Sequence, residues 1–213
     1  MAKKLLMSNN KNEGGMMFPP VTDGLCCFLD SNTLSTDSTE WIDYVGNNVF
    51  TMTGFNSGGV KQGVVTMNKN AKIDIASLNF NTVFIGFYRN NTSAQIDLIG
   101  TNPKTARFCM RANDYNIYSV NLSKFTFYNV CETSVFPDTA SPAMITSQIG
   151  KYDTGIIHMF MQFSQSSHSN LRVGYDTNSG STHQIFYAAF YNRELSAEER
   201  NAILAWFNDN YIL

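Results

Sequence analysis

Polar and hydrophobic residues alternate in short runs along most of the chain, and Asn, Gly, Ser, Asp and Pro interrupt these runs. In one run, Phe125 and Phe127 alternate with Lys124, Thr126 and Tyr128. Alternation with a period of two places successive side chains on opposite faces of a β-strand. The pattern predicts about a dozen strands, at residues 24–29, 49–52, 63–67, 72–75, 83–88, 96–99, 106–111, 116–120, 124–130, 156–163, 171–175 and 184–191.

Strands with one apolar and one polar face are typical of antiparallel sheets that share a core. Hydrophobic residues make up 43% of the 213 residues and include 16 Phe and 10 Tyr, which is ample for such a core. A dozen strands of this kind need two packed sheets. We therefore predict an all-β fold, a two-sheet antiparallel sandwich in which residues 21–213 form one domain.

One helix is predicted, and it follows the last strand. Ser196 and Glu199 have the spacing of a capping box, in which each side chain accepts a hydrogen bond from the other residue's backbone N–H. Ile203, Leu204 and Phe207 then form an apolar stripe. The sequence predicts a helix from Ser196 to about residue 208 that packs on the sandwich and carries no functional site.

Residues 1–20 differ from the rest, because they are rich in Asn, Lys, Gly and Met and have no periodicity. They are typical of an extended arm. We expect this arm to dock on a neighbouring subunit and to end in an anchor formed by Phe18, Pro19 and Pro20. The chain has neither the run of about 7–15 apolar residues of a secretory signal nor the roughly 20 of a membrane span. Synthesis in a cytoplasm is expected.

The end of the chain carries a recognisable motif. Residues 186–199, FYAAFYNRELSAEE, resemble the last strand and terminal helix of laminin-G-like, concanavalin A-like jelly-roll domains. Earlier pieces resemble the same family in the same order: Asp23-Gly24-Leu25, then Trp41, Asp43 and Gly46, then Leu171-Arg172-Val173-Gly174. The resemblance covers about residues 21–213. It implies a jelly roll of two curved antiparallel sheets, a frequent calcium site at the rim, and glycan or protein binding as the commonest activity.

Charge and motifs exclude several classes of function. With 15 Lys plus Arg against 17 Asp plus Glu, the net charge of -2 does not suit a nucleic-acid-binding protein. The six glutamates form no E-x-D-x-x-E strand of a retaining glycosidase, and G-x-S-x-G, H-E-x-x-H and Gly-rich phosphate loops do not occur. The three histidines share no ligand spacing, and the four cysteines form no C-x-x-C pair. We predict a protein that is not an enzyme.

Glycan binding needs only exposed aromatic rings and a few hydrogen-bonding groups, which several predicted loops offer. The candidate glycan-binding residues are Trp41, Asp43, Tyr44, Arg107, Arg111, Asp114, Tyr115, Tyr175, Asp176 and His183. The alternative for the aromatic residues is that they only close the edge of the sandwich. Calcium could draw oxygen ligands from Asp30, Asp37, Asp43 and Asp176, but no tight run of carboxylates exists, so no metal or cofactor is predicted.

A lectin-like sandwich, an N-terminal arm and no export signal occur together in bacteriophage virion components, which are assembled inside the host and released by lysis. Our hypothesis is a non-enzymatic head-fibre, capsid-decoration or tail module that contacts other virion subunits through residues 1–20. It would be a homo-oligomer and would present the sandwich for adhesion to a cell-surface glycan. Two alternatives remain: a purely structural virion subunit, and a polysaccharide-cleaving enzyme of the same fold.

Overall fold

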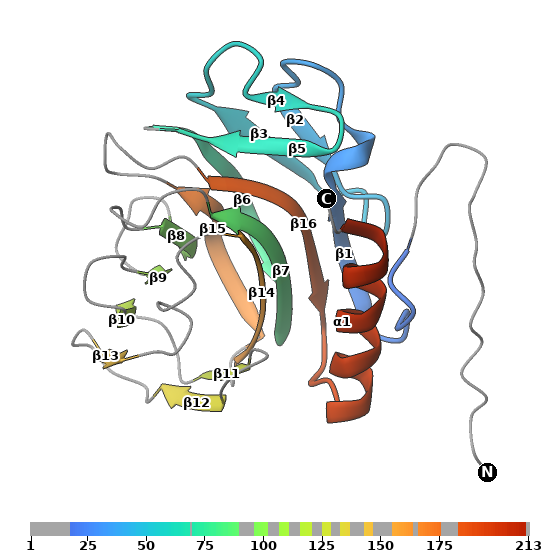
Figure 1. The fold of residues 1–213 in the computed structure, drawn as a ribbon, viewed down its shortest axis with the longest axis vertical. Coiled ribbons are helices and arrows are strands. Elements are labelled where there is room, and N and C mark those ends of the chain that lie inside the picture. Colours follow the sequence, from blue (N-terminus) through green and yellow to red (C-terminus); the bar gives the residue numbers. More distant parts are fainter. Residues whose placement is uncertain are drawn as a thin grey trace.

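The structure is a computed structural model. It describes residues 18–68, 70–89, 96–101, 107–110, 116–120, 125–128, 133–136, 143–146, 155–163, 166–175 and 183–211. These residues form two antiparallel sheets and one C-terminal helix (Figure 1). The fold class predicted from the sequence, a two-sheet antiparallel sandwich of the jelly-roll type, is confirmed.

Sheet I has eight strands among the described residues. In spatial order they are β12 (Thr133–Phe136), β11 (Phe125–Tyr128), β14 (Gly155–Phe163), β7 (Thr82–Arg89), β16 (His183–Tyr191), β5 (Val64–Met67) and β4 (Val60–Lys61), with β1 (Leu25–Asp30) also paired to β16. A short 3-10 helix, η1 (Ser31–Thr33), follows β1.

Sheet II also has eight described strands. Their order is β13 (Ala143–Thr146), β10 (Asn116–Val120), β9 (Arg107–Met110), β8 (Ile96–Thr101), β15 (Ser167–Tyr175), β6 (Lys72–Asn79), β3 (Val49–Thr53) and β2 (Glu40–Ile42). Most neighbours in both sheets are distant in sequence, so the chain crosses repeatedly between the sheets. Strand β2 forms one edge of sheet II.

Strand β16 organises the packing, because eight of its nine residues are buried. One half of β16 pairs with β5 and the other half with β1, while β7 runs along its opposite side. The register of β16 and β7 shifts between Ile185 and Tyr187. This bulge places Phe186 and Tyr187 together on the outer face of sheet I, whereas Ile185 and Ala188 contribute to the core between the sheets.

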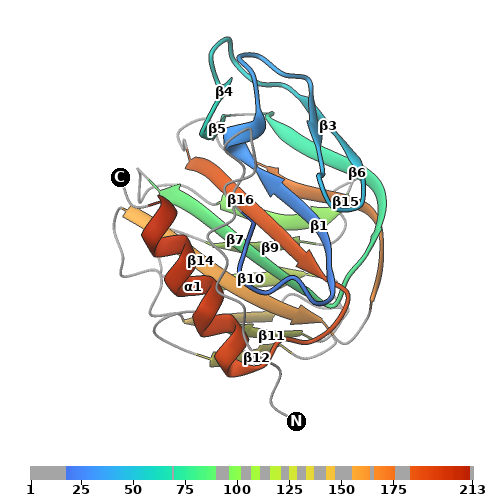
Figure 2. The ribbon, with the colours of Figure 1, turned by 90° about the vertical axis from the view of Figure 1, so that its right-hand side faces the viewer.

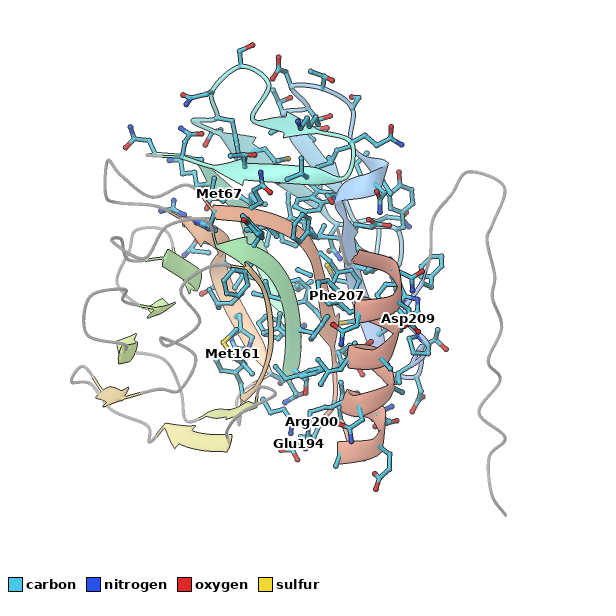
Figure 3. All side chains as sticks on the ribbon, in the orientation of Figure 1. Met67, Met161, Glu194, Arg200, Phe207 and Asp209 are labelled. Atoms are coloured by element: carbon cyan, nitrogen blue, oxygen red, sulfur yellow. The ribbon has the colours of Figure 1, made fainter. Side chains whose placement is uncertain are left out.

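Helix α1 (Ala197–Tyr211) lies along the outer face of sheet I (Figures 1 and 2). Phe207 lies on the side of the helix that faces the sheet, and Asp209 points away from it (Figure 3). Ile203 and Phe207 are fully buried in a second apolar cluster, as predicted. Gly86 of β7 is required here, because a Cβ atom at this position would overlap the ring of Phe207.

The predicted capping box is present at the start of α1. The N–H of Glu199 donates to Ser196 Oγ at 3.2 Å, and the N–H of Ser196 donates to Glu199 Oε2 at 2.9 Å. Arg193 donates two further hydrogen bonds to the Glu199 carboxylate, at 2.7 and 2.9 Å. The bidentate pair lowers the pKa of Glu199 and fastens the helix to the end of β16.

Some elements differ from the prediction. Strands β6 and β15 are longer than predicted, and β2, β4, β12 and β13 were not predicted at all. These four strands have two to four residues each, too few for alternation to identify them, so their pairing partners define them. Within the described residues, no helix is long and apolar enough to cross a bilayer.

Candidate binding site at the β2–β3 hairpin

Four large apolar side chains of the described residues are prominently exposed, and all four belong to the hairpin formed by β2 and β3. They are Ile42 (49% exposed), Tyr44 (46%), Val45 (36%) and Val49 (46%). Ile42 and Val49 are direct cross-strand partners, and Tyr44 and Val45 lie in the turn that joins the strands. We call these four residues the hairpin patch. Exposed apolar residues gathered in one hairpin are candidates for a binding site.

The turn of the hairpin is built around the buried carboxylate of Asp43. Its Oδ1 atom accepts hydrogen bonds from the backbone N–H groups of Phe28 at 2.7 Å and Val45 at 2.9 Å. Its Oδ2 atom accepts from the N–H of Gly46 at 2.8 Å and from the side-chain amide of Asn48 at 2.7 Å. One carboxylate therefore holds both ends of the turn and ties it to β1.

The negative charge of Asp43 also acts on the thiol of Cys26. Cys26 donates from its thiol to the backbone oxygens of Asn79 and Phe190 at 3.3 and 3.2 Å. Burial, followed by the negative charge of Asp43, raises the pKa of the Cys26 thiol to about 11. The thiol is therefore neutral at physiological pH and acts as a hydrogen-bond donor rather than as a nucleophile.

The strands beneath the patch are fixed in the main core. Trp41 and Phe50 are cross-strand partners, both fully buried, and alternation along β2 and β3 turns Ile42 and Val49 outward. The indole N–H of Trp41 donates to the backbone oxygen of Asp30 at 3.2 Å. The exposed side chains of the hairpin therefore belong to strands whose other face is fixed in the core.

A row of polar residues crosses sheet II next to the patch. Glu40, Thr51, Asp74 and Arg172 are successive cross-strand partners on β2, β3, β6 and β15. Arg172 is only 5% exposed and donates to Asp74 through Nε at 2.6 Å and Nη2 at 3.1 Å. Because Glu40 and Ile42 lie two residues apart in one strand, this row and the patch share a face of the sheet.

The structure changes the set of residues predicted to bind a glycan. Trp41 and Asp43 are fully buried, so we correct that part of the prediction: Trp41 supports the hairpin and Asp43 positions its turn. His183 is also fully buried, in β16, and is removed from the set. Tyr44 is exposed and stays a candidate. Two other candidates, Arg107 in β9 and Tyr175 in β15, have side chains outside the described part of the structure. The remaining candidates lie wholly outside the described residues: Arg111, Asp114, Tyr115 and Asp176.

The sequence analysis missed Ile42, Val45 and Val49. A signal for two of them exists, because Trp41 and Phe50 are apolar residues that prefer the core, and their neighbours in the strands must then face outward. This signal depends on a strand at residues 40–42, which is too short to show alternation and was not predicted.

Three of the four aspartates considered as calcium ligands are described, and each accepts a hydrogen bond from a backbone N–H group. Asp30 caps η1 through the N–H of Asn32 at 2.9 Å, Asp37 accepts from the N–H of Gly58 at 2.7 Å, and Asp43 holds the hairpin turn. Asp176 lies outside the described residues. In the part of the chain that is described, no group of three or more His, Cys, Asp and Glu side chains could hold a metal ion.

The predicted anchor residues contact the domain itself. The ring of Phe18 lies 5.5 Å from that of Phe28, and Pro19 is buried. The hydroxyl of Tyr191 donates to the backbone oxygen of Val21 at 3.1 Å. The root of the arm is thus fastened to the second apolar cluster, and docking of the arm on another subunit stays a prediction.

Comparisons with known proteins add little to this geometry. No family model matches the chain, and no curated protein matches it. Among solved structures the chain is similar to a Trypanosoma rangeli sialidase, with a TM-score of 0.49 and 10% sequence identity. The match covers 88% of this chain and 33% of the sialidase, so the chain spans about a third of that protein's length. A likeness this distant carries no argument about activity.

Proposed function

We propose that this chain is a non-enzymatic recognition module that binds a glycan at the hairpin patch. The observation that carries the proposal is the exposed set of Ile42, Tyr44, Val45 and Val49 on a turn held by the buried carboxylate of Asp43. A tyrosine ring offers an apolar face to a sugar ring and a hydroxyl for hydrogen bonding. A turn that is already rigid loses little conformational entropy when a ligand binds.

We further propose that the module is mounted on a larger assembly, as a virion-associated head-fibre, capsid-decoration or tail component. The support is the fastened root of the arm: Phe18 packs on Phe28, and Val21 binds the Tyr191 hydroxyl. Residues 1–17 precede this root and would provide the contact with other subunits. Because the root of the arm contacts the sandwich, a subunit that binds the arm would also hold the sandwich in place.

A glycan array with the full chain tests the binding proposal. The variant Tyr44→Ala removes the exposed ring without touching the core, and Asn208→Ala, on the exposed side of α1, is the matched control. We expect the Tyr44 variant to bind at least fivefold more weakly, because a stacked ring contributes about 1 kcal/mol. Equal binding by both variants, or no binding by the parent chain, would overturn the proposal.

Deletion of residues 1–17 tests mounting, because it keeps Phe18 and the contacts at the root. We expect the shortened chain to keep the circular dichroism spectrum of the parent but to be absent from assembled particles. Incorporation at the parent level would contradict the mounting proposal. Incorporated particles that bind no glycan would instead favour a purely structural subunit.

A polysaccharide-cleaving enzyme is the second candidate, and it would depend on the carboxylates of Glu40 and Asp74. Glu40 and Asp74 lie in the same row of sheet II with Thr51 between them, which separates their Cα atoms by about two strand spacings, or roughly 10 Å. Retaining hydrolysis needs carboxyl groups about 5 Å apart, and inverting hydrolysis about 6.5–9.5 Å. Both oxygens of the Asp74 carboxylate also accept hydrogen bonds from Arg172. Release of reducing ends from a polysaccharide, abolished by Glu40→Gln, would favour the enzyme.

A further inference from the structure

The composition of the hairpin patch narrows the class of glycan. The patch holds three aliphatic side chains, Ile42, Val45 and Val49, and one aromatic ring, Tyr44. Aliphatic side chains have no π system to stack on a hydroxylated sugar ring, but they gain free energy by covering methyl groups. We infer that the patch binds a neutral glycan whose sugars carry methyl groups, as 6-deoxy or acetamido substituents. This inference rests on the glycan-binding function proposed above.

Charge on the hairpin favours a neutral ligand. Residues 40–53 contain no Lys or Arg, and their two charged residues are Glu40, which is exposed, and Asp43, which is buried. The guanidinium group in the adjacent row, that of Arg172, is buried and donates two hydrogen bonds to Asp74. A sugar carboxylate at the patch would therefore meet the negative charge of Glu40 without an ion-pair partner on the hairpin.

The size of the patch favours a small ligand over a protein. Four side chains that are 36–49% exposed present roughly 300–400 Å² of surface if a large side chain carries about 150–250 Å². A stable protein interface buries about 800 Å² on each partner. The patch alone cannot hold a second copy of the chain at that standard, whereas its area suits one or two sugar units.

The test uses the full chain and matched pairs of methyl glycosides that differ in one group. The pairs are L-rhamnose with L-mannose, L-fucose with L-galactose, and N-acetylglucosamine with glucose, and glucuronate is the anionic probe. Affinity is measured by NMR titration, and saturation transfer shows which ligand protons touch the protein. We expect about threefold tighter binding within at least one pair for the methyl-bearing sugar, with the strongest saturation on its methyl protons, and the weakest binding for glucuronate.

The variant Val49→Thr locates the effect, because it replaces one exposed methyl group by a hydroxyl and keeps a β-branched side chain. We expect it to remove most of the preference for the methyl-bearing sugar, while Asn208→Ala keeps the preference. Equal affinity within all three pairs, combined with weaker binding by Tyr44→Ala, would overturn this inference and leave glycan binding intact. A preference that Val49→Thr does not change would overturn the assignment to the patch. Failure to bind any sugar here or on the array would overturn the proposed function as well.

Discussion

Replacement of Asp43 by Asn tests the role of the buried carboxylate in the hairpin turn. The two oxygens of Asp43 accept hydrogen bonds from the N–H groups of Phe28, Val45 and Gly46 and from the amide of Asn48, all between 2.7 and 2.9 Å. Asparagine offers one oxygen and one NH₂ group. Two of these four donors, and the backbone N–H of Asn48 at 3.5 Å, must then face the NH₂ group instead of an acceptor.

The magnitude follows from which donors lose their partner. The N–H of Phe28 is buried, so we expect the amide oxygen to stay opposite Phe28 and Val45. Asn48 can rotate its own amide and present an oxygen to the new NH₂ group, but the backbone N–H of Gly46 cannot adapt. A hydrogen bond to a charged acceptor contributes about 1.5–3 kcal/mol. We therefore expect the free energy of unfolding to fall by about 1.5–3 kcal/mol and Tm to fall by about 4–10 °C.

Urea denaturation of the full chain, followed by tryptophan fluorescence, measures this change. Asp37→Asn is the matched control, because Asp37 also accepts from a turn N–H, that of Gly58 at 2.7 Å, but is exposed and keeps an acceptor as Asn. We expect the control to change stability by less than about 0.5 kcal/mol. An unchanged midpoint for Asp43→Asn, or an equal loss in both variants, would refute the role assigned to Asp43.

Three further predictions concern the second cluster, the helix cap and the half-buried thiol of Cys26. Gly86→Ala places a methyl group on the ring of Phe207 and should cost about 1–3 kcal/mol in urea denaturation, which Phe207→Leu in the same chain should partly restore. The Arg193 hydrogen bonds lower the pKa of Glu199 from its usual 4.5, so their stabilisation is complete above that value and is lost as pH falls through the lowered pKa. Glu199→Gln should therefore lose less stability than the parent between pH 5 and pH 3; an equal loss contradicts this. Because the fold raises the pKa of Cys26 from 9.0 to about 11, iodoacetamide at pH 8 should label it at least about tenfold more slowly in the folded than in the unfolded chain, as followed by mass-spectrometric peptide maps; equal rates contradict this.

Local signals made much of the fold predictable. Ser196 and Glu199 identify the start of the helix, because both capping contacts lie within four residues of sequence. Alternating or continuous apolar runs identify the long strands, and β10 (Asn116–Val120) has the predicted bounds. These features depend on residues that are neighbours in the sequence, so the pattern alone contains them.

Burial of the candidate site residues was not predictable in the same way. Trp41, Asp43 and Tyr44 were all expected to be available to a ligand in one predicted loop. Asp43 is buried because its partner is the N–H of Phe28, fifteen residues earlier, and Trp41 is buried because its indole reaches the backbone of Asp30. Both contacts depend on how β1 packs against the hairpin, and no local sequence pattern determines that packing.

The segment that carries the family resemblance is also the segment under the strongest packing constraint. In β16 every residue except Gln184 is buried. The two faces of the strand contribute to different apolar clusters, and the capped helix follows directly. Residues confined in this way are selected by the fold, whatever the domain binds. The resemblance is therefore an argument for the sandwich and carries little information about the ligand. Ligand chemistry has to be sought where packing imposes no apolar residue, and Ile42, Tyr44 and Val49 are apolar at positions where the fold does not require it.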